Sequence, residues 1–284
     1  MKIGIIGDSC CDLTPEMIQE LQAQLVPLKI TVGEETFVDD RDIDLAALRG
    51  AIHNCKTAAS TACPSPEDYA QAMRQSDASM VITISAKLSG SHNAAMVARD
   101  LVLEETPEKK IHVFDSGSAS SGEVQIALQI RELEEQGLEF NEIVQRIETK
   151  LTQMHTLFIL EDLSTLMKNG RLNKVVGTVA TLLSLRPIMS DNGHGEIAML
   201  DKVRGTQKAL ARLTELVVGY TANCAKHSVR LVLSHCNCLE RGEELRAMLL
   251  AQCPALSEVL LVATRGLSTV YANEGGVIAA FHGA

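Results

Sequence analysis

The chain has 284 residues, 46% of them hydrophobic, with a formal net charge of −10 and a pI near 5.3. This length suits one large α/β domain or two small ones, and the acidic balance argues against nucleic-acid binding, which needs clustered Lys and Arg. No apolar run reaches the ~20 residues of a transmembrane helix, and the N-terminus resembles a strand more than a signal peptide, so we expect a cytoplasmic protein.

The first half of the chain alternates apolar strands with amphipathic helices. We expect strands at 3–6, 26–32, 80–85 and 110–116, and helices at 15–25, 45–54, 65–75, 93–105, 122–137 and 141–153. Because the strands are apolar on both faces and separated by helices, they predict a mostly parallel sheet with helices on both sides.

The second half has a different pattern, typical of a mixed sheet with helices. We expect strands at 155–160, 229–235, 256–264 and 275–281, helices at 161–170, 205–221 and 239–252, and a hairpin at 185–203 that turns at Asp191-Asn192-Gly193. The prediction is therefore an α/β protein of two domains, 1–155 and 156–284. The aliphatic segment VVGTVATLLSL at 175–185 suggests a long apolar pocket between the domains or beneath the loops.

Three loops rich in Ser, Thr and Gly are expected to link a strand to the following helix: TACPSP (61–66), KLSGS (87–91) and DSGSASSG (115–122). Ligands of open parallel sheets bind at that edge. In the first loop Ser65, Pro66 and Asp68 predict a capping box, and one serine can cap the helix after each of the others. The surplus hydroxyls next to helix N-termini favour an anion, and without a G-x-x-x-x-G-K-S/T loop a single carboxylate fits better than a nucleotide.

The ordered set of GDSCCDL, TACPSP, ISAKLSGSHNAA, FDSGSASSG, LSTLMKNGRL, RPI and KVRGTQKAL resembles the DegV family over nearly the whole chain. The resemblance implies two α/β domains that hold a long-chain fatty acid between them, with no cofactor. It also implies a lipid-binding protein that is not itself an enzyme. Several members serve as the acyl-binding subunit of a bacterial fatty acid kinase, so the resemblance implies an ATP-dependent kinase as partner.

The family motifs fall on particular residues of this chain. The threonine of T-S-x-P-S falls on Thr61, followed by Ala62 in place of the usual serine, and the S-G-T motif falls on Ser89 and Ser91. The resemblance implies that Thr61, Ser89 and Ser91 bind the carboxylate.

Two arginines and a tyrosine complete the set of residues that match family motifs. G-G-R-L appears with Arg171, and R-G-x-x-K with Arg204, and the resemblance implies that both arginines contact the partner or the transferred phosphate. Tyr271 stands where many members have a histidine. A tyrosine can hydrogen-bond the ligand but cannot titrate like an imidazole near neutrality, so a lipid carrier outside the kinase pathway stays an alternative.

Other functions remain open. Ser9 in GDSCCDL resembles the nucleophile of GDS-type ester hydrolases, and Asp191 with His194 spells their D-x-x-H pair, although the G-x-N-D block is missing. A phosphosugar-binding protein could use the same loops. The cluster HCNC at 235–238 lacks a second ligand cluster and Asp8 and Asp115 fit loop caps, so we predict no metal site.

Overall fold

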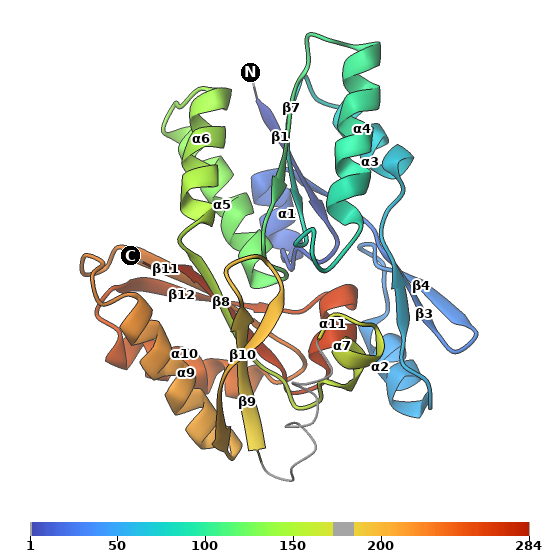
Figure 1. Ribbon diagram of the computed structural model, residues 1–284. Helices are drawn as coiled ribbons and strands as arrows, with labels where there is room; N and C mark the ends of the chain where they lie inside the picture. The colour runs from blue at the N-terminus through green and yellow to red at the C-terminus, as the bar shows by residue number, and fades with distance from the viewer. Residues whose placement is uncertain (1, 173–184, 284) are drawn as a thin grey trace.

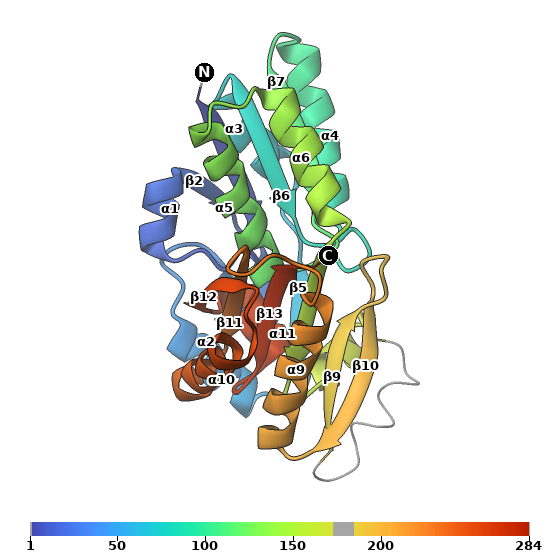
Figure 2. The same cartoon turned by 90° about the vertical axis from the view of Figure 1, so that its left-hand side faces the viewer.

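The computed structural model describes residues 2–172 and 185–283, which form two stacked layers of sheet and helix. The N-terminal layer stands above the C-terminal layer in Figure 1, and the turned view in Figure 2 shows α5 (Ser121–Glu135) reaching from one to the other. Side chains of α5 pack against Val232 and Val262 of the C-terminal layer in the same core cluster. The mixed α/β fold with separate parallel and mixed sheets confirms the predicted class.

The N-terminal layer is built on a parallel four-stranded sheet. Its strands, in spatial order, are β2 (Ala23–Val26), β1 (Ile3–Asp8), β6 (Ala78–Thr83) and β7 (Lys110–Asp115). Alternate residues serve opposite faces: Ile5 and Met80 pack toward α1 (Pro15–Leu21), α5 and α6 (Phe140–Leu151), whereas Ile6 and Val81 pack toward α3 (Pro66–Arg74) and α4 (Ser91–Glu105). The sheet is therefore covered on both sides, as its apolar strands predict.

A small antiparallel sheet was not predicted. It has the order β4 (Glu35–Val38), β3 (Lys29–Val32), β5 (Ser60–Ala62), and α2 (Leu45–Asn54) connects β4 to β5. The predicted helix 15–25 and strand 26–32 are wrong at their junction. The helix ends at Leu21 because Gln22 adopts a left-handed conformation, with φ of 48°. β2 then ends before Pro27, which has no N–H for the ladder, and the chain enters the second sheet.

The C-terminal layer is a mixed six-stranded sheet. Its strands, in spatial order, are β10 (Ile197–Arg204), β9 (Leu185–Asp191), β8 (Met154–Ile159), β13 (Val277–His282), β11 (Val229–His235) and β12 (Leu256–Ala263). Only β11 and β12 are parallel neighbours among these strands. The helices of this layer within the described residues are α7 (Ser164–Lys168), α9 (Thr206–Tyr220), α10 (Leu239–Gln252) and α11 (Gly266–Ala272). Helix α11 was not predicted, and the domain boundary at residue 155 stays a prediction.

Candidate ligand-binding site

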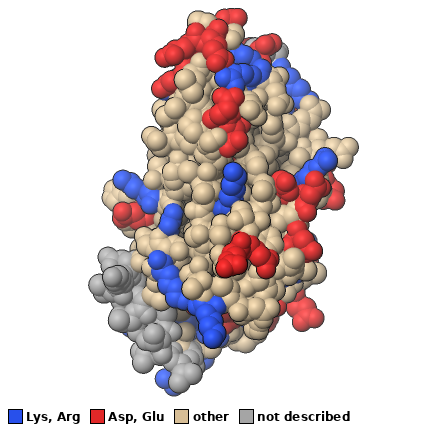
Figure 3. Space-filling model, turned by 90° about the vertical axis from the view of Figure 1, so that its right-hand side faces the viewer, with Lys and Arg blue, Asp and Glu red and all other residues tan. Residues whose placement is uncertain are grey.

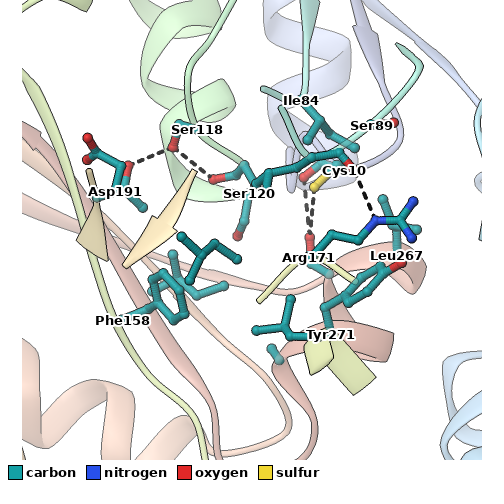
Figure 4. Close-up of a pocket in the computed structure, with 18 of the residues that line it drawn as sticks. Cys10, Ile84, Ser89, Ser118, Ser120, Phe158, Arg171, Asp191, Leu267 and Tyr271 are labelled. Atoms are coloured by element: carbon teal, nitrogen blue, oxygen red, sulfur yellow. Dashed lines mark hydrogen bonds between the residues drawn. The ribbon is translucent and has the colours of Figure 1, made fainter. Parts of the chain in front are cut away.

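A cavity of about 910 Å³, including its opening to solvent, lies where the two layers meet (Figure 4). Most lining side chains are apolar and come from both layers, among them Leu28, Ile84, Phe158, Leu160, Leu166 and Ile278. Of the segment 175–185 that was expected to line the pocket, residues 175–184 lie outside the described part of the chain.

Polar side chains gather at one end of the cavity. Thr61 Oγ1 lies 2.8 Å from the hydroxyl of Tyr271, and Asn169 Nδ2 donates to the same tyrosine oxygen at 3.3 Å. Ser89 and Arg171 line the cavity on the same side, as Figure 4 shows for Ser89, Arg171 and Tyr271. We call Thr61, Ser89, Arg171 and Tyr271 the head cluster.

Thr61 reaches the cavity from β5, and not from a loop at the edge of the parallel sheet as predicted. β5 pairs with β3 so that Thr61 lies opposite Ile30. The predicted capping box is confirmed: Ser65 Oγ accepts from the Asp68 N–H at 3.2 Å, and an Asp68 carboxylate oxygen accepts from the Ser65 N–H at 2.8 Å. The cap therefore uses Ser65 and leaves the Thr61 hydroxyl to the cavity.

The helix that carries Tyr271 begins at a buried carboxylate. Asp39 accepts hydrogen bonds from the N–H groups of Gly266 (3.0 Å) and Leu267 (2.7 Å), the first two residues of α11. A carboxylate is favourable at a helix N-terminus, where N–H groups lack partners inside the helix. Asp39 is fully buried, and burial raises its pKa above the usual value. It fixes the start of the short helix that carries Tyr271 to the cavity.

Ser89 and Ser91 have different positions. Ser89 lines the cavity, donates to Ser91 Oγ at 3.1 Å and accepts from the Ser91 N–H at 3.2 Å. Ser91 is fully buried at the start of α4 and is not among the cavity-lining residues. The predicted serine cap of α4 is wrong, because its N-cap is Gly90. The N-cap of α5 is a serine as predicted, Ser120, but its side chain makes no cap hydrogen bond. A direct contact between Ser91 and a ligand stays a prediction.

The two predicted arginines, Arg171 and Arg204, lie in different parts of the structure. Arg171 lines the cavity, where its Nε donates to the Leu88 carbonyl at 3.1 Å and its Nη1 to the Asn169 carbonyl at 2.5 Å. Arg204 lies exposed at the end of β10, outside the described lining of the cavity. Arg171 therefore gives the head cluster a positive charge, whereas Arg204 is a surface residue.

The other end of the cavity is also polar, which sequence analysis missed. Ser118, Thr156, Ser190 and Asp191 line it, and Figure 4 shows Ser118 and Asp191 far from Tyr271, with Phe158 nearer to them. We call these four residues the distal cluster. The surplus serines of DSGSASSG were the signal for Ser118, but Thr156 and Ser190 lie in strands whose position depends on the fold.

The loop that carries Ser118 has an unusual backbone. Ser120 has φ of 56° and ψ of −117°, a region that non-glycine residues rarely occupy. Its hydroxyl donates to Asp12 Oδ2 at 2.5 Å, and Asp12 Oδ1 accepts from the Arg265 N–H at 2.6 Å. Burial raises the pKa of Asp12 to about 7. Asp12 thus connects the loop before α5 to the start of α11 through these two hydrogen bonds.

Two more carboxyl groups lie beneath the cavity. Atoms of Asp8, Cys10 and Glu123 that could bind a metal lie within 4.8 Å of one another, all buried. Asp8 accepts from the N–H groups of Cys10 (3.0 Å) and Ile84 (2.9 Å), which confirms its predicted capping role. Burial raises the pKa of Asp8 to about 6 and that of Glu123 well above its usual value.

Ser9 does not have the surroundings of a hydrolase nucleophile. It is fully buried, and its Oγ accepts from the Leu28 N–H at 3.0 Å. His194 is exposed in the hairpin turn, where Asp191 accepts from the Gly193 N–H at 2.7 Å as the turn chemistry predicted. The serine is not among the cavity-lining residues, and its hydroxyl has a structural partner.

Two layers of sheet and helix around an apolar cavity with a hydroxyl-rich end define an α/β protein that binds small ligands. A family model described as "Uncharacterised protein, DegV family" matches residues 2–281, and the chain belongs to this family. A "DegV domain-containing protein" of Streptococcus gordonii is 35% identical over 283 residues, 98% of each chain.

Two solved structures are similar to this chain over 98% or more of its length. A DegV family protein from Ruminococcus gnavus, refined with vaccenic acid, is 37% identical with a TM-score of 0.90, over 98% of this chain and 99% of that one. The Streptococcus pneumoniae Fatty Acid Kinase B3 protein loaded with linoleic acid is 32% identical with a TM-score of 0.91, over 100% of both chains. No helix within residues 2–172 and 185–283 is long and apolar enough to cross a membrane.

Proposed function

We propose that this protein binds a long-chain fatty acid, with the carboxylate at the head cluster and the acyl chain in the apolar cavity. The observation that carries the proposal is the Thr61–Tyr271 hydroxyl pair, 2.8 Å apart, at one end of a cavity whose surface is mainly apolar. Each methylene moved from water into such a cavity contributes about 0.8 kcal/mol before ordering costs. The solved relatives that hold vaccenic and linoleic acid support the same ligand class.

Charge supports one orientation of the ligand. Arg171 lies at the head cluster, whereas Asp191 lines the other end. A carboxylate is attracted to the first end and repelled from the second, and neutral hydroxyl donors complete its hydrogen bonds. A phosphosugar fits less well, because no lysine is among the described residues that line the cavity. The proposal requires no cofactor and no metal.

Native mass spectrometry of gently purified protein tests this function. We expect a mass increment equal to one long-chain fatty acid, which gas chromatography of the extracted lipid then identifies. Recovery of a phosphosugar or a nucleotide without lipid would overturn the proposal.

We further propose that the protein presents the bound acid to an ATP-dependent kinase in the cytoplasm. The support is the likeness to the pneumococcal Fatty Acid Kinase B3 protein, together with the exposed Arg204 in the R-G-x-x-K motif. Arg204→Glu should abolish acyl-phosphate formation with the organism's own kinase and leave fatty-acid affinity intact. Lys226→Glu is the matched control, because Lys226 is exposed beyond the far end of α9, ~22 Å along that helix.

Two outcomes would contradict the kinase-coupled role. Equal phosphorylation of wild type and Arg204→Glu would remove the arginine from the partner surface. If the kinase leaves the wild type unphosphorylated but accepts Tyr271→His, the tyrosine is the cause, and the protein is a lipid carrier outside the kinase pathway.

A further inference from the structure

The distal cluster is a polar feature that a plain acyl chain does not use. Its hydroxyls lie at the end of the cavity away from Tyr271, where the methyl end of a fatty acid oriented by Arg171 would rest (Figure 4). A methyl group offers no hydrogen bond, and burying polar groups without partners costs free energy. The chemistry of this end therefore fits something other than a hydrocarbon tail.

The hydrogen bonds of the cluster leave capacity for a ligand. Ser118 Oγ and Thr156 Oγ1 are 2.6 Å apart, and within the described part of the chain the only other hydrogen bond of Ser118 Oγ is a weak one to the Ala119 carbonyl, at 3.4 Å. Ser190 Oγ has no hydrogen-bond partner among the residues that the structure describes. These three residues are 5%, 8% and 5% exposed, so they have little contact with bulk water. A hydroxyl has one donor and two acceptor sites, and the cluster can therefore both donate to and accept from a further group.

The walls around the cluster are fixed by a contact between the two layers. Ser85 Oγ donates to the Gly195 carbonyl at 2.7 Å, which holds the tip of the β9–β10 hairpin against the N-terminal layer. A Cβ at Gly195 would lie 2.4 Å from Ser85 Oγ and 3.3 Å from Gly117 Cα, so the hairpin approaches as closely as glycine allows. Because the hairpin carries Ser190 and Asp191, the cluster is held in place within the cavity.

Charge limits what the cluster can accept. Asp191 lines this end, and its negative charge would repel a second carboxylate on the ligand. An uncharged hydroxyl could donate to an acidic or hydroxyl oxygen and accept from the Ser118–Thr156 pair. The chemistry thus favours a neutral oxygen over a charged one.

We infer that the cavity selects fatty acids that carry a hydroxyl group on the distal part of the acyl chain, which the distal cluster recognises. This inference rests on the proposed fatty-acid binding and adds the substrate class. A wholly apolar pocket would disfavour such an acid relative to its unsubstituted parent, because it would bury the hydroxyl without a partner.

Calorimetric titration of delipidated protein tests the inference with stearic acid, its 10-, 12- and 18-hydroxy derivatives, and octadecanedioic acid. We expect at least one hydroxy acid to bind threefold or more tightly than stearic acid, and the dicarboxylic acid to bind more weakly than 18-hydroxystearic acid. If stearic acid binds and no hydroxy isomer binds more tightly, the inference is wrong while the proposed function stands. If none of the acids binds, the proposed function fails and this inference fails with it.

Variants show which residues cause the selectivity. For each variant, the affinity for the hydroxy acid is divided by the affinity for stearic acid, and the ratio is compared with that of the wild type. Thr156→Val keeps the side-chain shape and removes one hydroxyl, and Ser190→Ala removes another if the first variant folds poorly. Either variant should lower the ratio threefold or more. Thr214→Val is the control, because Thr214 is a buried threonine in α9 whose hydroxyl bonds the Leu210 carbonyl. An unchanged ratio in both Thr156→Val and Ser190→Ala would overturn the inference.

Discussion

Tyr271→Phe removes one hydroxyl from the head cluster and leaves the ring in place. That hydroxyl lies 2.8 Å from Thr61 Oγ1 and 3.3 Å from Asn169 Nδ2, so both partners already orient it at the cavity. A hydrogen bond to a charged group contributes about 1.5–3 kcal/mol. Fatty-acid affinity should therefore fall about 10- to 150-fold. Tyr271 is partly exposed, so water can take over the lost contacts of Thr61, and the free energy of unfolding should change little.

Calorimetric titration with palmitic acid and with its methyl ester separates the head-group contact from packing. The ester keeps the chain and loses the negative charge, so Tyr271→Phe should weaken acid binding far more than ester binding. Tyr220→Phe is the matched control, because Tyr220 stacks on His155 with ring centroids 4.1 Å apart and does not line the cavity. Equal weakening of acid and ester, or a loss of acid affinity below threefold, would refute a carboxylate contact at Tyr271.

Three further predictions follow from the same contacts. Thr61→Val and Ser89→Ala should each weaken fatty-acid binding roughly tenfold or more with little change in thermal stability, and unchanged titration curves for both would reject the assignment. Tyr271→His should add a pH step, with tighter binding below about pH 6.5 as the imidazole gains a positive charge beside the carboxylate; affinities that run parallel to wild type from pH 5 to 8 would count against it. Asp12 has its pKa raised to about 7, so its contribution to stability is present below about pH 4 and is lost as pH rises through 7. Asp12→Asn should flatten the fall in unfolding free energy between about pH 4 and 7, measured by urea denaturation, and an unchanged slope would contradict the raised pKa of Asp12.

Local sequence signals predicted most of the regular structure. The parallel strands were recognisable because they are apolar on both faces, and the start of α3 because Ser65, Pro66 and Asp68 form a capping box within four residues. The hairpin turn at Asp191-Asn192-Gly193 was likewise a local pattern. Each of these depends on residues close together in the chain.

What sequence analysis missed depends on contacts between distant segments. β5 is a three-residue edge strand whose existence requires β3 as a partner, so Thr61 was placed in a loop. Helix α11 starts where Asp39, more than 220 residues earlier, accepts from its first N–H groups. Thr156 and Ser190 become neighbours of the Ser118 loop only after the two layers meet. Tyr271 itself was found through the family resemblance, and the structure supplies its partner.

A crystal structure of the protein with a saturating long-chain fatty acid is the most direct test of the central claim. The account predicts the carboxylate within hydrogen-bonding distance of Thr61 and Tyr271, near Arg171, with the acyl chain running past Phe158 toward Ser118. A carboxylate bound at the distal cluster, or a lipid bound outside this cavity, would contradict it.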